Sequence, residues 1–284
     1  MTTAPIFSLV FSAALAVGAR AAPRRVAEAT PPPAPQSARR GRAADVLARA
    51  IHSRDMWRRG REKLMLNDFG ELGHFRAANA ALPPPGPGEK RVVFFGDSIT
   101  AGWPLDQFFP GRPYVNRGIG GQTTSQALVR FRQDVIDLRP AAVVILLGTN
   151  DIAGNTGAID VSDIEKNLAS MAELARVHHI AVVFSSLTPV HDYTPQSDIA
   201  FPLRPPATIR ELNDWLKAHC AELGATYLDY FSAMIDGTGL MRRELALDGL
   251  HPNHAGYEIM TPLAEAAIQR ALAAPRAPAA PGPR

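Results

Sequence analysis

The chain has 284 residues, of which 46% are hydrophobic and 20% are charged, and its formal net charge is +3. Such a composition excludes a disordered chain and a collagen-like fibre. The single cysteine excludes an intramolecular disulfide framework and a cysteine-rich zinc site. The longest uncharged apolar run, residues 6–19, is shorter than the roughly 20 residues that a membrane-spanning helix needs, so no integral membrane segment is expected.

The N-terminus has the pattern of a secretory leader. The apolar run is followed by Ala19-Arg20-Ala21, which is typical of a signal-peptide cleavage site. Residues 1–21 are therefore predicted to be a signal peptide, and the protein is expected to be periplasmic or secreted. The first five residues contain no Lys or Arg, which leaves a cytoplasmic protein as the alternative.

The positive charge belongs to the N-terminal part of the chain. Residues 1–62 hold 11 basic and 4 acidic side chains, and the remainder is net negative. Trp57 is the one aromatic residue in the Arg-rich stretch 39–61, which does not fit a nucleic-acid surface, and no nucleic-acid partner is expected. The composition predicts a Pro/Arg-rich linker over residues 22–43, helices over 44–85 with an interruption near Gly60, and a disordered tail over 274–284.

Residues 86–273 form one repeating pattern of short apolar runs and amphipathic helices. Runs that are apolar throughout and alternate with helices indicate an α/β fold with a parallel sheet covered on both faces. The expected strands are 92–95, 114–116, 142–147, 180–184 and 226–228, and the expected helices are 124–138, 161–177, 208–223 and 254–272. Ligands of such sheets bind at the carboxyl ends of the strands.

The first expected strand leads into Gly96-Asp97-Ser98-Ile99-Thr100. A glycine at a strand-to-helix turn allows a sharp bend that exposes the following serine. Ser98 is therefore a candidate nucleophile, although a serine at this place could equally cap the helix.

The next two strands end in groups that can donate hydrogen bonds. Gly118, Gly120 and Gly121 place bare backbone N–H groups before a helix, which favours an anion. Thr123 stands where a dinucleotide fingerprint needs glycine, so a transient oxyanion fits better than a cofactor phosphate, and no cofactor is expected. Asn150, after the third strand, offers a side-chain amide donor or, alternatively, makes a local turn.

The last motif is Asp248-Gly249-Leu250-His251, immediately before the final helix. At this spacing the carboxylate can accept a hydrogen bond from one imidazole nitrogen while the other nitrogen faces a nucleophile.

Together, the blocks G-D-S-I-T, G-I-G-G-Q-T, G-T-N-D and D-G-L-H-P resemble those of the SGNH, or GDSL, hydrolases, over about residues 91–273. The resemblance implies a flavodoxin-like three-layer α/β/α sandwich with five parallel strands. It further implies a catalytic triad of Ser98, Asp248 and His251, and an oxyanion hole formed by the Ser98 and Gly121 backbone N–H groups and the Asn150 side chain. The second block is most similar to that of bacterial platelet-activating-factor acetylhydrolase-type members, although Gln122 stands where many members carry Asp.

The expected activity is that of a serine esterase or acylhydrolase, which cleaves short-chain carboxylic esters of small molecules or glycans through an acyl-enzyme without a metal. One alternative is a metal-dependent phosphoesterase that uses Asp97, Asn150, Asp248 and His251, and the other is a non-catalytic exported binding protein on the same fold.

Trp103 is a candidate substrate contact, with core packing as the alternative. The proline-rich segment 187–207 is predicted to form a wall of the site, with Phe201 and Arg204 as contacts, unless it is a disordered insertion. The sequence carries no indication of an oligomeric state.

Overall fold

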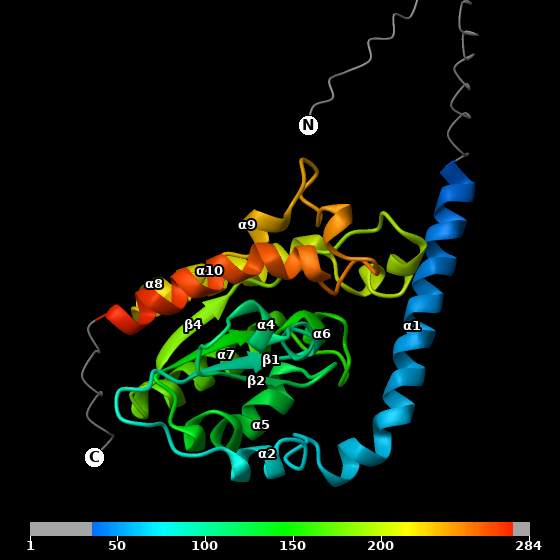
Figure 1. The fold of residues 1–284 in the computed structure, drawn as a ribbon. Coiled ribbons are helices and arrows are strands. Elements are labelled where there is room, and N and C mark those ends of the chain that lie inside the picture. The colour runs from blue at the N-terminus through cyan, green and yellow to red at the C-terminus, as the bar shows by residue number, and fades with distance from the viewer. Residues whose placement is uncertain (1–35, 275–284) are drawn as a thin grey trace, which may run out of the picture.

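The computed structural model describes residues 36–274, with side chains described from residue 42 (Figure 1). The expected signal peptide and residues 275–284 of the expected tail lie outside this range. Five parallel strands form one sheet in the order β2-β1-β3-β4-β5. Their bounds are Val92–Gly96 (β1), Tyr114–Gly118 (β2), Ala142–Leu146 (β3), Ala181–Ser185 (β4) and Thr226–Leu228 (β5). This is the strand order of flavodoxin-like proteins, so the expected fold class is confirmed.

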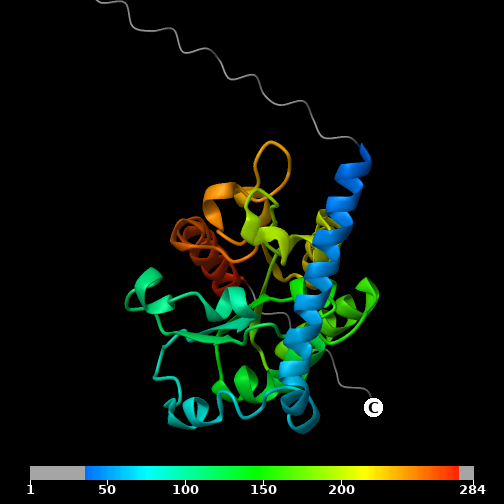
Figure 2. The same ribbon diagram turned by 90° about the vertical axis from the view of Figure 1, so that its right-hand side faces the viewer.

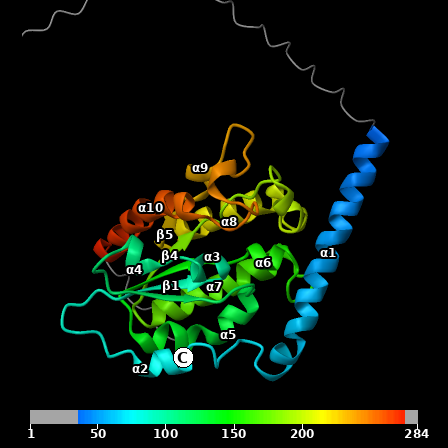
Figure 3. The same cartoon turned by 45° about the vertical axis from the view of Figure 1, so that its right-hand side comes forward.

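Helices cover both faces of the sheet, as continuous apolar strands require. α10 (His254–Ala273) packs on β3, β4 and β5 from one side. α5 (Thr124–Asp134) lies beside α7 (Val161–Val177) on the other side, where α7 also contacts α8 (Pro206–Leu223). Figure 3 shows α10 above the sheet and α5 below it. The predicted helix 124–138 is wrong at its end, because α5 stops at Asp134 and a separate 3₁₀ turn spans Ile136–Leu138.

The central strands bring their carboxyl ends to one level. β1 and β3 are buried at every position, and Gly96 is in register with Gly118 on one side and Leu146 on the other. The segments after these strands therefore start side by side. The short elements are α2 (Arg76–Ala81), α3 (Ser98–Ala101), α4 (Leu105–Phe108), α6 (Thr149–Ile152), α9 (Phe231–Met234) and the 3₁₀ turns η2 (Pro195–Asp198), η3 (Phe201–Leu203) and η4 (Arg243–Leu245).

The N-terminal extension differs from expectation. One uninterrupted helix, α1 (Gln36–Asn67), replaces both the last part of the predicted linker, residues 36–43, and the predicted break near Gly60. A glycine in a helix costs only about 1 kcal/mol, and the flanking residues Trp57 and Arg61 hold contacts with the body of the protein. Figure 2 shows α1 running across the side of the molecule toward which the strands point. The division of the chain into extension and hydrolase domain stays a prediction.

Arg130 ties the carboxyl ends of β1 and β2 together. Its fully buried guanidinium donates to the backbone oxygens of Gly96 and Arg117, at 3.0 and 2.9 Å, and pairs with Asp134 at 3.0 Å. Burial lowers the pKa of Arg130 to about 10, against the opposing effect of Asp134, so the side chain stays charged at neutral pH.

Substituting Arg130→Ala is expected to lower the free energy of unfolding by about 3–5 kcal/mol, because it leaves the Asp134 carboxylate buried without its ion pair. Urea denaturation would measure this. Arg132→Ala, at an exposed position on the same helix, serves as the control and is expected to change stability by no more than about 0.5 kcal/mol. Equal losses for both variants would contradict the structural role of the buried pair.

Candidate active site

Ser98 stands at the start of α3, directly beyond β1, with its side chain only partly exposed. Asp97 caps this helix, since its Oδ1 accepts a hydrogen bond of 3.0 Å from the Ile99 N–H. Gly96 allows the close turn, because a Cβ there would lie 2.1 Å from the Thr100 Oγ1. The capping role is thus taken by Asp97, which leaves the Ser98 hydroxyl available for chemistry.

A chain of three side chains ends at the Ser98 hydroxyl. The Oγ of Ser98 lies 2.8 Å from Nε2 of His251, and Nδ1 of His251 lies 2.6 Å from Oδ2 of Asp248. The other oxygen of Asp248 accepts the His251 backbone N–H at 2.8 Å. Gly249 makes this tight loop possible, since its φ is +76° and a Cβ there would lie 2.2 Å from the His191 carbonyl oxygen. The structure therefore brings together all three residues predicted for the triad.

The pKa values of the two aspartates of the site are shifted in opposite directions. Burial raises the pKa of Asp248, but hydrogen bonds from the His251 ring and from the His251 and Leu250 N–H groups outweigh it and hold the pKa well below the usual range. Asp248 is therefore ionised at neutral pH. For the wholly buried Asp97, burial dominates and raises the pKa to about 6.

Asn150, on α6, lies between the segments that follow β1 and β2. Its Nδ2 donates to the Gln122 carbonyl oxygen at 3.1 Å and to Asp97 Oδ2 at 3.3 Å. Its Oδ1 accepts a hydrogen bond of 3.0 Å from Arg204, which fixes the amide with its N–H groups toward this junction. The loop that contains Gly120 and Gly121, here called the glycine loop, lies beside Ser98, since a Cβ at Gly120 would come within 3.9 Å of the Ser98 Cβ.

Two of the predicted substrate contacts are buried in the structure. Arg204 is 6% exposed and donates to Thr149 Oγ1 and the Ala200 carbonyl as well as to Asn150. Its buried guanidinium therefore fixes the Asn150 side chain and does not face solvent. Trp103 is 3% exposed because its ring packs among aromatic neighbours of the core. Phe201, half-buried in η3, stays a prediction. The segment 187–207 is ordered through η2 and η3 and is not a disordered insertion.

Residues outside the predicted domain also reach the site. Trp57 of α1 lies against Gly121, and Glu71 accepts a hydrogen bond of 3.3 Å from the Gln122 side chain. Trp57 was notable in the sequence only as the one aromatic residue of a basic stretch, and nothing in the spacing pointed to Glu71.

A match to a known family adds to this geometry. Residues 94–259, more than half of the chain, match the model of the GDSL-like lipase/acylhydrolase family. The chain belongs to this family. It is accordingly classed with the hydrolases of ester bonds.

Individual relatives agree with that assignment. A crystal structure of a GDSL-like lipase from Bacteroides thetaiotaomicron is 40% identical, with a TM-score of 0.66 over 72% of this chain and 99% of that one. Esterase TesA of Pseudomonas aeruginosa is 28% identical over 57% of this chain and 79% of its own length. The lipoprotein YqeF of Bacillus subtilis is 33% identical over 37% of this chain, and the match spans about half of YqeF, 51%.

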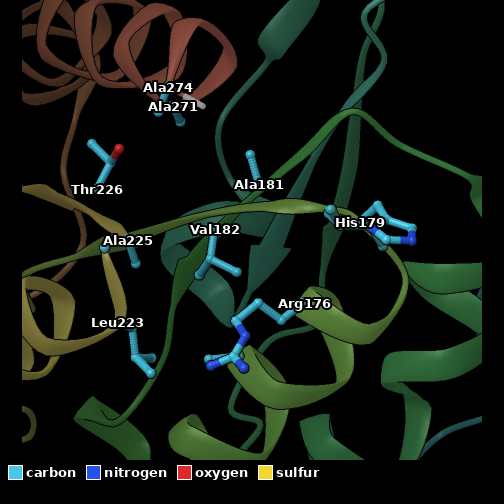
Figure 4. A pocket seen from close by; sticks show the side chains of 12 residues that line it. Arg176, His179, Ala181, Val182, Leu223, Ala225, Thr226, Ala271 and Ala274 are labelled. Atoms are coloured by element: carbon cyan, nitrogen blue, oxygen red, sulfur yellow. The ribbon is translucent and has the colours of Figure 1, made fainter. Parts of the chain in front are cut away.

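A cavity of about 170 Å³, drawn in Figure 4, has no member of the triad in its lining. It is lined by Ala181 and Thr226, the first residues of β4 and β5, together with Arg176, His179 and Ala271. The cavity therefore opens at the amino ends of the strands, at the edge of the sheet opposite to the triad, and we assign it no part in the chemistry.

Residues 36–274 contain no group of three His, Cys, Asp or Glu side chains placed to hold a metal ion. None of the helices in this range combines the length and the apolar composition of a membrane span.

Proposed function

We propose that the protein is a serine esterase that cleaves short-chain carboxylic esters through an acyl-enzyme on Ser98. The observation that carries this proposal is the hydrogen-bonded chain from Asp248 through His251 to the Ser98 Oγ, with distances of 2.6 and 2.8 Å. It lies at the carboxyl end of β1, the edge at which such sheets bind ligands.

In the first half-reaction, His251 Nε2 takes the hydroxyl proton while the Ser98 Oγ bonds to the ester carbonyl carbon and the carbonyl electron pair moves to oxygen. The ionised Asp248 stabilises the resulting imidazolium through Nδ1. As the tetrahedral intermediate collapses, the alcohol leaves with the proton from His251. In the second half-reaction a water molecule attacks the acyl-enzyme by the same steps and releases the acid.

The negative charge on the carbonyl oxygen needs donors. We assign this role to the backbone N–H groups of Ser98 and Gly121 and to the Asn150 amide, each worth about 3 kcal/mol in the transition state. The Asn150 Nδ2 donates to the Gln122 carbonyl at 3.1 Å and makes a longer contact of 3.3 Å with Asp97. The weaker of these two bonds is the one that a developing oxyanion would replace.

The surroundings of Ser98 favour a small acyl group. Trp103 and its aromatic neighbours fill the space beside α3, and Trp57 covers Gly121. The substrate class is therefore a short-chain ester of a small molecule or glycan. The apolar leader and the similarity to the lipoprotein YqeF support export from the cytoplasm.

The function is tested with a series of p-nitrophenyl esters from acetate to palmitate, assayed with and without a chelator. The expected result is a maximum of kcat/KM at acetate or butyrate that the chelator does not change. Chelator-sensitive cleavage of a phosphodiester such as bis-p-nitrophenyl phosphate would favour the metal-dependent phosphoesterase. No cleavage of any ester would favour the non-catalytic binding protein.

On acidification, kcat/KM is expected to fall, because His251 must be neutral to accept the Ser98 proton. Asp248 cannot cause this fall, since its pKa lies far lower. Asp97, whose pKa burial raises to about 6, also titrates on the acid side of neutrality, so the Asp97→Asn variant is the control and should keep the acid limb. A flat wild-type profile from pH 5 to 8 would remove histidine from the mechanism.

A further inference from the structure

The indole of Trp57 lies directly on the glycine loop beside Ser98. A Cβ added to Gly121 would stand 2.4 Å from the ring carbon Cζ2 of Trp57 and 2.9 Å from Cη2, so the six-membered ring covers the Gly121 Cα. Gly121 has a φ of +77°, a conformation that glycine adopts but also leaves easily. The Arg61 guanidinium lies 5.1 Å from the Trp57 ring centroid, on the same helix.

α1 is fixed to the segments around the site by one of its faces. Ala50 is fully buried, Arg54 donates to the Ala153 carbonyl at 3.4 Å, and Arg61 pairs with Glu71. These residues and Trp57 recur every three or four positions, which places them in one stripe. Arg49, beside this stripe, pairs with Asp198 of η2 at 2.9 Å. The helix thus contacts the segments after β2, β3 and β4, in the arrangement seen in Figure 2.

A polar chain runs from the same helix to Asn150. Arg61 and the Gln122 Nε2 both donate to Oε1 of the buried Glu71, and the Gln122 carbonyl accepts from the Asn150 Nδ2. The Gln122 Oε1 in turn accepts a hydrogen bond of 2.6 Å from Arg130. An amide can donate to Glu71 and accept from Arg130 at once, whereas a carboxylate could only accept. This explains why glutamine, and not aspartate, suits position 122 of this chain.

Building on the serine-esterase function proposed above, we propose that Trp57 is a positioning residue of the oxyanion hole. The indole holds Gly121 in its left-handed conformation, and the Arg61–Glu71–Gln122 chain holds the carbonyl to which Asn150 is bonded. The Gly121 N–H and the Asn150 amide are then both fixed before substrate binds. Through Trp57 and Arg61, α1 therefore contributes to the geometry of the active site. Donors that are fixed in advance stabilise the transition state without a cost of reorganisation during the reaction.

The test compares Trp57→Ala and Trp57→Phe with Met56→Ala, whose side chain is 51% exposed on the outer surface of the same helix. kcat, KM and the melting temperature are measured for each on p-nitrophenyl acetate. Trp57→Ala is expected to lower kcat by about 10- to 100-fold with KM within about twofold, since a donor displaced by about 1 Å costs that much. Trp57→Phe should recover most of the loss because its ring can still cover Gly121, and Met56→Ala should match the wild type.

A second measurement separates positioning from general destabilisation. Because Gly121 directly precedes Gln122, whose carbonyl accepts from Asn150, a shift of Gly121 also moves the partner of Asn150. The effect of Trp57→Ala on kcat should therefore be smaller in an Asn150→Ala background than in the wild type. A wild-type kcat for Trp57→Ala, or an equal loss of kcat in both backgrounds together with a raised KM, would overturn the proposal.

Measuring Ser98→Ala in the same assay distinguishes a failure of the Trp57 proposal from a failure of the proposed serine-esterase function. An inactive Ser98→Ala protein with a fully active Trp57→Ala protein would refute only the role of Trp57. An active Ser98→Ala protein would refute the serine mechanism itself.

Discussion

Replacing Ser98 with alanine is expected to lower kcat by about 10⁶-fold, the loss seen when the nucleophile of a comparable triad is removed. Without Oγ, no acyl-enzyme can form, and His251 has no hydroxyl from which to accept a proton. The fold should not change, because Asp97 caps α3 and the serine side chain has no capping role. The measurement is kcat on p-nitrophenyl acetate together with the melting temperature of the same preparation.

The control for this variant is Ser232→Ala, at an exposed position on α9, which should keep wild-type kcat. If Ser98→Ala retained activity within about tenfold of the wild type, a different nucleophile or a directly activated water would have to carry the reaction.

The Asn150→Ala variant is expected to lower kcat by about 10²–10³, the cost of one oxyanion donor. KM for a small ester should move little, because the lost bond strengthens only as charge develops on the carbonyl oxygen. Some stability will also be lost, since Arg204 is buried and donates to the Asn150 Oδ1. Kinetic constants and the melting temperature must therefore be measured on the same sample.

Asn213→Ala provides the matched control. Asn213, on α8, is also buried. It accepts a hydrogen bond of 2.7 Å from the Leu187 N–H and donates one of 3.2 Å to the Leu187 carbonyl oxygen. It should lose stability while keeping most of its kcat. If Asn150→Ala behaved in the same way, with a raised KM and only a modest fall in kcat, Asn150 would be a structural residue of its loop.

The sheet and the triad could be predicted because their signals are local. A strand buried on both faces is apolar along its whole length, and α7 was predicted with its observed bounds, Val161–Val177, from apolar spacing alone. Asp248 and His251 lie three residues apart, so one turn brings them together. Ser98 and Asn150 needed the further rule that parallel strands present their carboxyl ends at one edge.

The contacts of α1 and the surroundings of Trp103, Arg204 and Gln122 could not be predicted, because they depend on packing between segments that are far apart in sequence. α1 is polar, and single residues such as Trp57 and Arg61 attach it to loops that lie far away in sequence. Residue type suggested that Trp103 and Arg204 line the substrate site. Only tertiary structure shows that one is packed in the core and that the other is bonded to Asn150 from behind. The partnership of Gln122 with Glu71 has no local signal at all.

The most direct test of the account is to label the protein with a fluorophosphonate and locate the modified residue by peptide mass spectrometry. The proposed serine mechanism predicts one adduct on the peptide that contains Ser98, no adduct in Ser98→Ala, and much slower labelling in His251→Ala, because the imidazole activates the hydroxyl. An adduct on another residue, or steady ester turnover by protein whose Ser98 is fully blocked, would contradict it.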